Sequence, residues 1–228
     1  MNLARGVALV AFDGRSGALR GGERLDLALA GAELVSLARA ERIAVQRGRV
    51  IILDETPVGS TQLDVALATL RPFSEPHLLS PWLHRRALGL RGRYLGDLHE
   101  AGEVEPRGRR RFGLFGDRRS QLTATSSRRD LLLQLDSDAP ADPTFAALVH
   151  LAAITRKDLR RRLAATVGNL DAEGGDRITG AAKAERVALF ATRDAARRVR
   201  EPQSSSDYPL DPDVQRAWDL GRSVDNGL

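Results

Sequence analysis

Arginines are the side chains of this sequence whose type and spacing could do chemistry. Arg85, Arg86, Arg91 and Arg93 fall within nine residues of one another. A guanidinium group forms two parallel hydrogen bonds to one phosphate group, so this cluster is a candidate anion site at one end of a pair of helices. A solvated helix face explains the same spacing equally well, because arginine supplies nearly all of the 35 basic residues of the chain.

A second basic segment is the run GRRRFGLFGDRR at residues 108–119. It surrounds Phe112, Leu114 and Phe115 with arginines, among them Arg111. Such a ribbon fits the phosphates of DNA, the headgroups of a membrane, or a plain solvated surface. Apolar residues between cations can enter a bilayer shallowly while the cations hold the headgroups. Packing of the apolar residues onto the body of the protein is the simpler interpretation.

The residues that catalytic and metal sites need are missing or poorly spaced. The chain has no cysteine, which excludes disulfides and thiolate ligands. No two of its four histidines have the spacing of a metal site, and no phosphate-binding loop or nucleophile elbow occurs. We therefore expect no enzyme, no metal site and no cofactor.

Charge and composition limit the class of partner and the filling of the core. The formal net charge is +5, and a positive field attracts polyanions and anionic membranes without selecting between them. Hydrophobic residues make up 42% of the chain but aromatic residues only 4%, which is typical of helices packed through leucine, alanine and valine. The apolar run at residues 2–12 is too short to span a bilayer. We expect a cytoplasmic protein whose membrane contact is peripheral.

The pattern of apolar residues predicts an all-α fold, mainly a helical bundle, with two small peripheral β-hairpins. One hairpin is expected at residues 43–53 and the other in GEVEPRG followed by RRRFGLF, residues 102–115. Residues 1–200 form one domain, and the segment 201–228, rich in proline and serine, is expected to be a mobile tail. Helices are expected at residues 2–12, 22–40, 63–70, 76–86, 88–101, 128–136, 143–154, 157–167 and 181–199.

One interpretation combines the helix at 88–101 with the ribbon after it. Together they have the order of a recognition helix and a wing in a winged-helix DNA-binding protein. The face that would read bases is poor in Asn, Gln, Ser and Thr. It contains Gly89, Gly92 and Gly96, and each glycine weakens an exposed helix by roughly 1 kcal/mol relative to alanine. We keep DNA binding as an alternative and do not expect nucleic acid as the partner.

Four segments, LALAGAELVSLARAERIAV, VIILDETPVGSTQLDVALATL, LRGRYLGDLHEAGEV with FGLF, and PTFAALVHLAAI, follow one another along the chain. In this order they resemble the Golgi phosphoprotein 3 family. The run VIILDETPVGSTQLDVALATL is similar to the family's strand, T-P-x-G turn and L-D-x-A-L helix. LALAGAELVSLARAERIAV is similar to its glycine-containing helix and the strand after it. LRGRYLGDLHEAGEV with FGLF resembles its helix, turn and L-x-L-F hairpin, and PTFAALVHLAAI its late apolar helix. The resemblance covers most of residues 2–167.

The resemblance implies a helical domain that binds the headgroup of phosphatidylinositol 4-phosphate on a membrane surface. It also implies that the hairpin at 109–119 serves self-association near the membrane. In eukaryotic members the headgroup pocket uses a tryptophan and three arginines. Matched by position, Arg91 falls on one of these arginines, Leu88 and Ala30 fall on the other two, and the tryptophan position falls near Arg20 or Gly21.

We therefore predict a peripheral, non-enzymatic membrane adaptor that binds anionic phospholipid headgroups and recruits client proteins. Two alternatives stay open, a winged-helix-type DNA-binding regulator and a protein-binding scaffold without lipid affinity. The hairpin residues Arg111, Phe112, Leu114 and Phe115 are predicted to contact the membrane or a second copy of the chain. The predicted headgroup-binding residues are Arg91, Arg85, Arg86, Arg93 and Arg20.

Overall fold

The fold is mainly helical with small two-stranded sheets, which confirms the predicted fold class. The computed structural model describes residues 2–71, 76–106, 120–124, 126–136, 142–152 and 180–198. The helices are α1 (Leu3–Ala11), α2 (Gly22–Arg39), α3 (Thr61–Thr69), α4 (Leu79–Ala87), α5 (Leu90–Glu100), α6 (Arg128–Leu135), α7 (Pro143–Leu151) and α9 (Gly180–Arg198). Three antiparallel pairs join β1 (Phe12–Asp13) to β2 (Ala18–Leu19), β3 (Ile43–Gln46) to β4 (Arg49–Ile52), and β5 (Val104–Pro106) to β6 (Ser120–Leu122). No helix in these ranges combines the length and the apolar character needed to cross a membrane.

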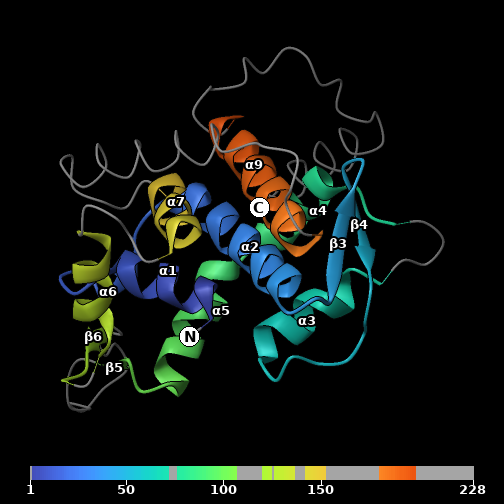
Figure 1. The fold of residues 1–228 in the computed structure, drawn as a ribbon. Coiled ribbons are helices and arrows are strands. Elements are labelled where there is room, and N and C mark those ends of the chain that lie inside the picture. Colours follow the sequence, from blue (N-terminus) through green and yellow to red (C-terminus); the bar gives the residue numbers. More distant parts are fainter. Residues whose placement is uncertain are drawn as a thin grey trace, which may run out of the picture.

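Helix α2 runs through the centre of the molecule (Figure 1). It contacts α1, α3, α4, α5, α7 and α9, and leucines and alanines fill its whole circumference, as a helix enclosed on all sides requires. Two buried acids, Asp26 and Glu33, interrupt this apolar surface. Glu33 bonds to Arg86 of α4, and Asp26 bonds to Arg91 of α5. The two carboxylates therefore fix where α4 and α5 lie on the central helix.

Backbone hydrogen bonds fix the start of α4 against the β3–β4 hairpin. The Val50 N–H donates to the His77 carbonyl, and the Leu79 N–H donates to the Gly48 carbonyl, each at 2.9 Å. At its other end α4 passes into α5 through Gly89, which has a φ of 73°, a left-handed conformation that glycine adopts without strain. With both ends held, α4 presents one side to α3.

Most of the predicted elements are present, and the second hairpin differs from its prediction. Val104 lies opposite Leu122 and Pro106 opposite Ser120, so the partner strand is Ser120–Leu122 and the proposed pairing with RRRFGLF is wrong. That run lies in residues 107–119, outside the described residues, as do the helix expected at 157–167 and the tail at 201–228.

The pair β1–β2 was not expected, because two-residue strands carry no alternation to recognise. The Asp13 carboxylate organises its turn: it accepts hydrogen bonds from the backbone N–H groups of Arg15 and Ser16 and from the Ser16 hydroxyl.

Helix α5 is part of the bundle. Leu90, Tyr94 and Leu98 are fully buried, and α5 contacts α1 and α2. Gly92 and Gly96 lie where an added side chain would meet no atom within 4 Å. The outward side of α5 thus lacks a row of side chains that could read bases, and this arrangement does not favour the winged-helix interpretation.

Candidate anion-binding site

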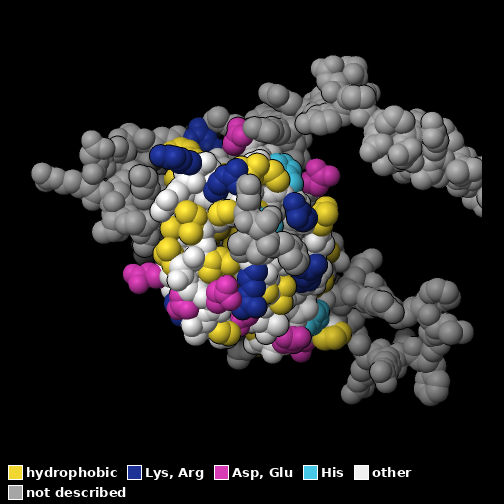
Figure 2. All heavy atoms as spheres, turned by 90° about the vertical axis from the view of Figure 1, so that its right-hand side faces the viewer, with side chains coloured by type: hydrophobic (Ala, Val, Ile, Leu, Met, Phe, Trp, Pro, Cys, Tyr) yellow, Lys and Arg dark blue, Asp and Glu magenta, His cyan; other side chains and the backbone are white. Residues whose placement is uncertain are grey.

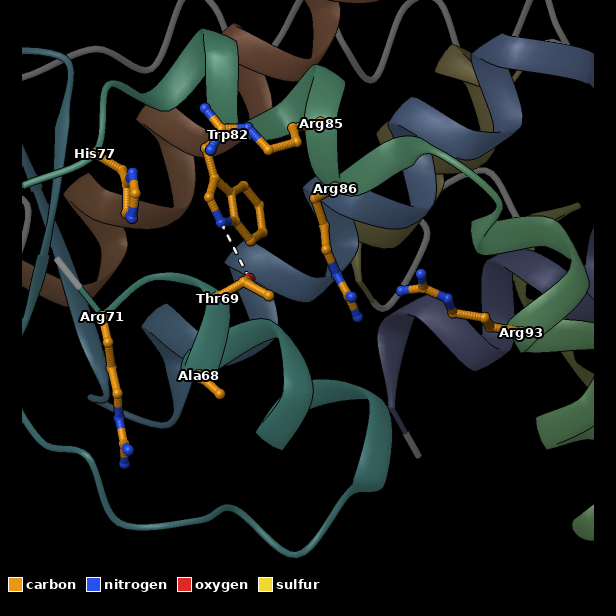
Figure 3. A pocket seen from close by; sticks show the side chains of 8 residues that line it. All are labelled: Ala68, Thr69, Arg71, His77, Trp82, Arg85, Arg86 and Arg93. Atoms are coloured by element: carbon orange, nitrogen blue, oxygen red, sulfur yellow. Dashed lines mark hydrogen bonds between the residues drawn. The ribbon is translucent and has the colours of Figure 1, made fainter. Parts of the chain in front are cut away.

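A pocket of about 570 Å³ lies between the end of α3 and one side of α4 (Figure 3). Of the described residues that line it, four are arginines, one is a histidine, and none is acidic. A concave basic surface of this kind is complementary to an anion with several phosphate oxygens. The lining residues are Ala68, Thr69, Arg71, His77, Trp82, Arg85, Arg86 and Arg93.

Trp82 anchors α4 to α3 within the pocket. Its side chain is buried, and its indole N–H donates to the Thr69 hydroxyl at 3.3 Å, the dashed line in Figure 3. That hydroxyl in turn donates to the Ala66 carbonyl at 2.7 Å. The hydrogen bond between the indole N–H and the Thr69 hydroxyl joins α4 to α3, so the indole holds the two helices at a fixed separation.

Arg86 belongs to a buried network that supports the pocket. Its guanidinium donates to the Glu33 carboxylate at 2.7 and 2.9 Å and to the Gln62 carbonyl at 3.1 Å. The Tyr94 hydroxyl donates to the same carboxylate at 3.0 Å. Burial raises the pKa of Glu33, against the opposing effect of Arg86, and burial and Glu33 together raise the pKa of Tyr94. The Glu33 carboxylate already balances the charge of Arg86. Arg86 therefore holds the wall of the pocket in place and is not a free cation for a ligand.

Arg85 and Arg93 are the cations of the pocket that are available to a ligand. Both are exposed, and neither forms a hydrogen bond or ion pair with the described part of the chain. Arg71 lies 3.2 Å from Glu55, but the two side chains are 56% and 59% exposed, so water or another anion can replace this contact. Among the described residues, the four arginines of the pocket minus their partners Glu33 and Glu55 leave a formal charge of +2.

Three of the predicted headgroup residues come together and two lie elsewhere. Arg85, Arg86 and Arg93 line the pocket, whereas Arg91 and Arg20 do not. Asp26 accepts hydrogen bonds from the Arg91 backbone N–H at 3.0 Å and from its Nε at 2.8 Å, and Asp13 lies 2.6 Å from Arg20. The five predicted arginines are therefore divided between the pocket, lined by three of them, and ion pairs with Asp26 and Asp13.

Two pocket residues, Arg71 and His77, were not among those predicted. They lie on either side of residues 72–75, which are outside the described ranges. Arg71 follows α3, and His77 precedes α4 and accepts a backbone hydrogen bond from Val50 of β4. No local pattern marks them in the sequence. The predicted hairpin residues Arg111, Phe112, Leu114 and Phe115 also fall outside the described residues. In the part of the chain that is described, no group of three or more His, Asp or Glu side chains is arranged to hold a metal ion.

Comparison with known families agrees with this helical architecture. The sequence profile of the Golgi phosphoprotein 3 (GPP34) family matches residues 3–219. The chain belongs to the Golgi phosphoprotein 3 family. The resemblance inferred from the T-P-x-G turn and the helices around it is thereby confirmed, over a longer stretch than the motifs covered. No curated protein matches the chain.

In this member of the Golgi phosphoprotein 3 family, the basic pocket is lined by residues other than those at the positions that the resemblance assigned to a headgroup. Of those positions, Ala30 is buried, Leu88 carries no charge, and Arg91 is bound to Asp26. Arg93, on the same helix as Arg91, instead reaches toward the pocket from α5 (Figure 3).

Proposed function

We propose that this protein attaches reversibly to membrane surfaces by binding phosphate groups of anionic lipid headgroups in the pocket lined by Arg71, Arg85 and Arg93. The observation that carries the proposal is the pair of exposed guanidinium groups, Arg85 and Arg93, which have no hydrogen-bond or ion-pair partner among the described residues and line a pocket whose described lining contains no acid. Membership of the Golgi phosphoprotein 3 family, which is not a family of known enzymes, is consistent with a lipid-binding role. A phosphoinositide such as phosphatidylinositol 4-phosphate is the preferred ligand, and recruitment of client proteins as a non-enzymatic adaptor is the function.

The surface around the pocket suits such an attachment. Figure 2 shows basic and apolar side chains next to one another, with acidic side chains among them, on the face that carries β3, β4, α3 and α4. Near an anionic leaflet each arginine contributes roughly 1 kcal/mol. A few arginines acting together give binding that is useful and still reversible.

Co-sedimentation with lipid vesicles tests the proposal. Phosphatidylcholine vesicles containing phosphatidylserine or phosphatidylinositol 4-phosphate are expected to pellet the protein, and pure phosphatidylcholine vesicles are not. Replacement of both Arg85 and Arg93 by alanine is expected to lower the affinity about thirty-fold, from the loss of about 2 kcal/mol.

The matched control replaces Arg15 and Arg129 by alanine. Both are exposed arginines, in the β1–β2 turn and on α6, so the loss of charge is the same while the pocket is intact. Equal losses for the two double variants would mean that net charge alone, and not the pocket, binds the membrane. Equal pelleting on anionic and neutral vesicles would reject the lipid function and favour a protein-binding scaffold.

A further inference from the structure

Leu88 is the most exposed large hydrophobic residue in the described part of the chain. Its relative exposure is 72%, and it lies at the end of α4, directly before Gly89 and the start of α5. Single exposed leucines are common on protein surfaces. The position of Leu88 is distinguished by the charges around it.

Arginines flank Leu88 on both sides. Arg85 precedes it by three residues, and Arg91 follows it by three. The Leu88 N–H donates to the Arg85 carbonyl at 3.4 Å, so the exposed leucine and Arg85 belong to the same turn at the end of α4. Arg85 lines the pocket from α4 and Arg93 lines it from α5, and Leu88 is in the short turn that joins these two helices.

We infer that Leu88 inserts into the acyl region of the anionic leaflet whose headgroups Arg85 and Arg93 bind. This inference rests on the proposed function and adds to it an orientation, in which the α4–α5 turn is the tip that faces the membrane. A leucine among arginines is suited to the boundary between headgroups and acyl chains, because the cations stay with the phosphates while the apolar side chain leaves water. An anionic bilayer satisfies both requirements at once, whereas a purely apolar partner would leave Arg85 and Arg93 without counter-charges.

Leu133 on α6 provides the contrast within the same molecule. It is 62% exposed, but the residues three before and three after it are Asp130 and Asp136. Helix α6 also lies at the opposite side of the molecule from α4 in Figure 1. Asp130 and Asp136 offset the charge of Arg129, which precedes Leu133 by four residues, so this second site lacks a surplus of positive charge and Leu133 is expected to stay in water.

The absence of cysteine from the chain makes the test direct. Leu88→Cys and Leu133→Cys each introduce a single thiol, which is labelled with an environment-sensitive nitrobenzoxadiazole dye. With phosphatidylcholine vesicles containing phosphatidylserine, the label at position 88 is expected to brighten and shift to shorter wavelength, and brominated acyl chains are expected to quench it. The label at position 133 is expected to change in neither way.

Pelleting of the same labelled samples distinguishes the insertion of Leu88 from the binding of the protein to anionic lipid. If both proteins pellet and the label at position 88 remains in water, the insertion of Leu88 is rejected while the lipid function stands. If neither pellets, both are rejected. In the unlabelled protein, Leu88→Ala is expected to lower vesicle affinity about ten-fold and to leave binding of the water-soluble headgroup inositol 1,4-bisphosphate unchanged. An equal loss for both ligands would instead assign Leu88 to the pocket.

Discussion

Inside the core, the Glu33 carboxylate receives three hydrogen bonds from Arg86 and Tyr94. Removing one partner of a buried ion pair typically costs about 3–5 kcal/mol, because the other charge remains without compensation. Arg86→Met is therefore expected to lower the free energy of unfolding by about 3–5 kcal/mol in urea denaturation.

The neighbouring exposed residue serves as the control for this variant. Arg85→Ala is expected to change stability by no more than about 0.5 kcal/mol, although it weakens vesicle binding. The double variant Glu33→Leu with Arg86→Met is expected to recover part of the lost stability, since no buried charge is left unpaired. Similar stabilities for the Arg85 and Arg86 variants would show that the buried pair does not hold α4 on α2.

At the surface, Asp13 gives the molecule a defined acid response. The Ser16 hydroxyl above all, with the backbone N–H groups of Arg15 and Ser16 and the charge of Arg20, lowers the pKa of Asp13 to about 2, against the opposing effect of desolvation. Because the folded pKa lies below the unfolded value, ionised Asp13 stabilises the fold above about pH 4, and this contribution is lost as the pH falls toward 2. As the pH falls between these values, the melting temperature of the Asp13→Asn variant is expected to decrease less than that of the unchanged protein. Parallel curves of melting temperature against pH for the two proteins would contradict a stabilising role of ionised Asp13.

At the scale of elements, the contact between α2 and α9 depends on Gly31. A Cβ atom placed there would lie 2.7 Å from Thr192 Cγ2 and 2.9 Å from Thr192 Cβ. Thr192 is fully buried and its hydroxyl donates to the Ala188 carbonyl at 2.7 Å, so this β-branched side chain has little room to move. Gly31→Ala is expected to lower the free energy of unfolding by about 1–3 kcal/mol, the usual cost of overpacking.

At a second glycine, substitution by alanine is expected to change the free energy of unfolding in the opposite direction. An alanine at Gly92 on α5 would meet no atom within 4 Å, so Gly92→Ala is expected to stabilise the helix by up to about 1 kcal/mol. Thermal or urea unfolding of the two variants measures the difference. Destabilisation by both substitutions to the same extent would mean that Gly31 is not a packing contact.

Elements with a strong local pattern were predictable from the sequence. The β-branched runs around Gln46, Arg47 and Gly48 predicted β3 and β4, and Gly102, with a φ of 68°, ends α5 where expected. The pairing of β5 was not predictable, because the two phenylalanines and the leucine of RRRFGLF favour a strand more than the residues Ser120–Leu122 do. The candidate site was predictable only in part: proximity in sequence brought Arg85, Arg86 and Arg93 together. Arg71 joins these three arginines through tertiary packing, whereas Arg91 binds the Asp26 carboxylate and does not line the pocket. Neither contact can be read from the spacing of residues along the chain.

At the scale of the whole molecule, charge and apolar insertion are expected to act on the same membrane contact but to respond differently to salt. The net charge of +5 attracts the chain to anionic vesicles over a distance set by the Debye length, which falls from about 10 Å at 0.1 M salt to about 3 Å at 1 M. Over that range the affinity of the unchanged protein is expected to fall at least about ten-fold, the equivalent of about 1.4 kcal/mol.

The variants separate the two contributions to that affinity. The double variant Arg85→Ala with Arg93→Ala should bind more weakly at low salt and respond less steeply to added salt, because fewer arginines contact the headgroups. Leu88→Ala should bind more weakly at every salt concentration with an unchanged slope, because apolar transfer involves no counter-ions. Vesicle titrations at several salt concentrations measure both quantities. If the loss of Arg85 and Arg93 leaves the salt dependence of vesicle affinity unaltered, the electrostatic contact lies elsewhere on the chain. If Leu88→Ala alters this salt dependence, the leucine positions the arginines and does not itself enter the bilayer.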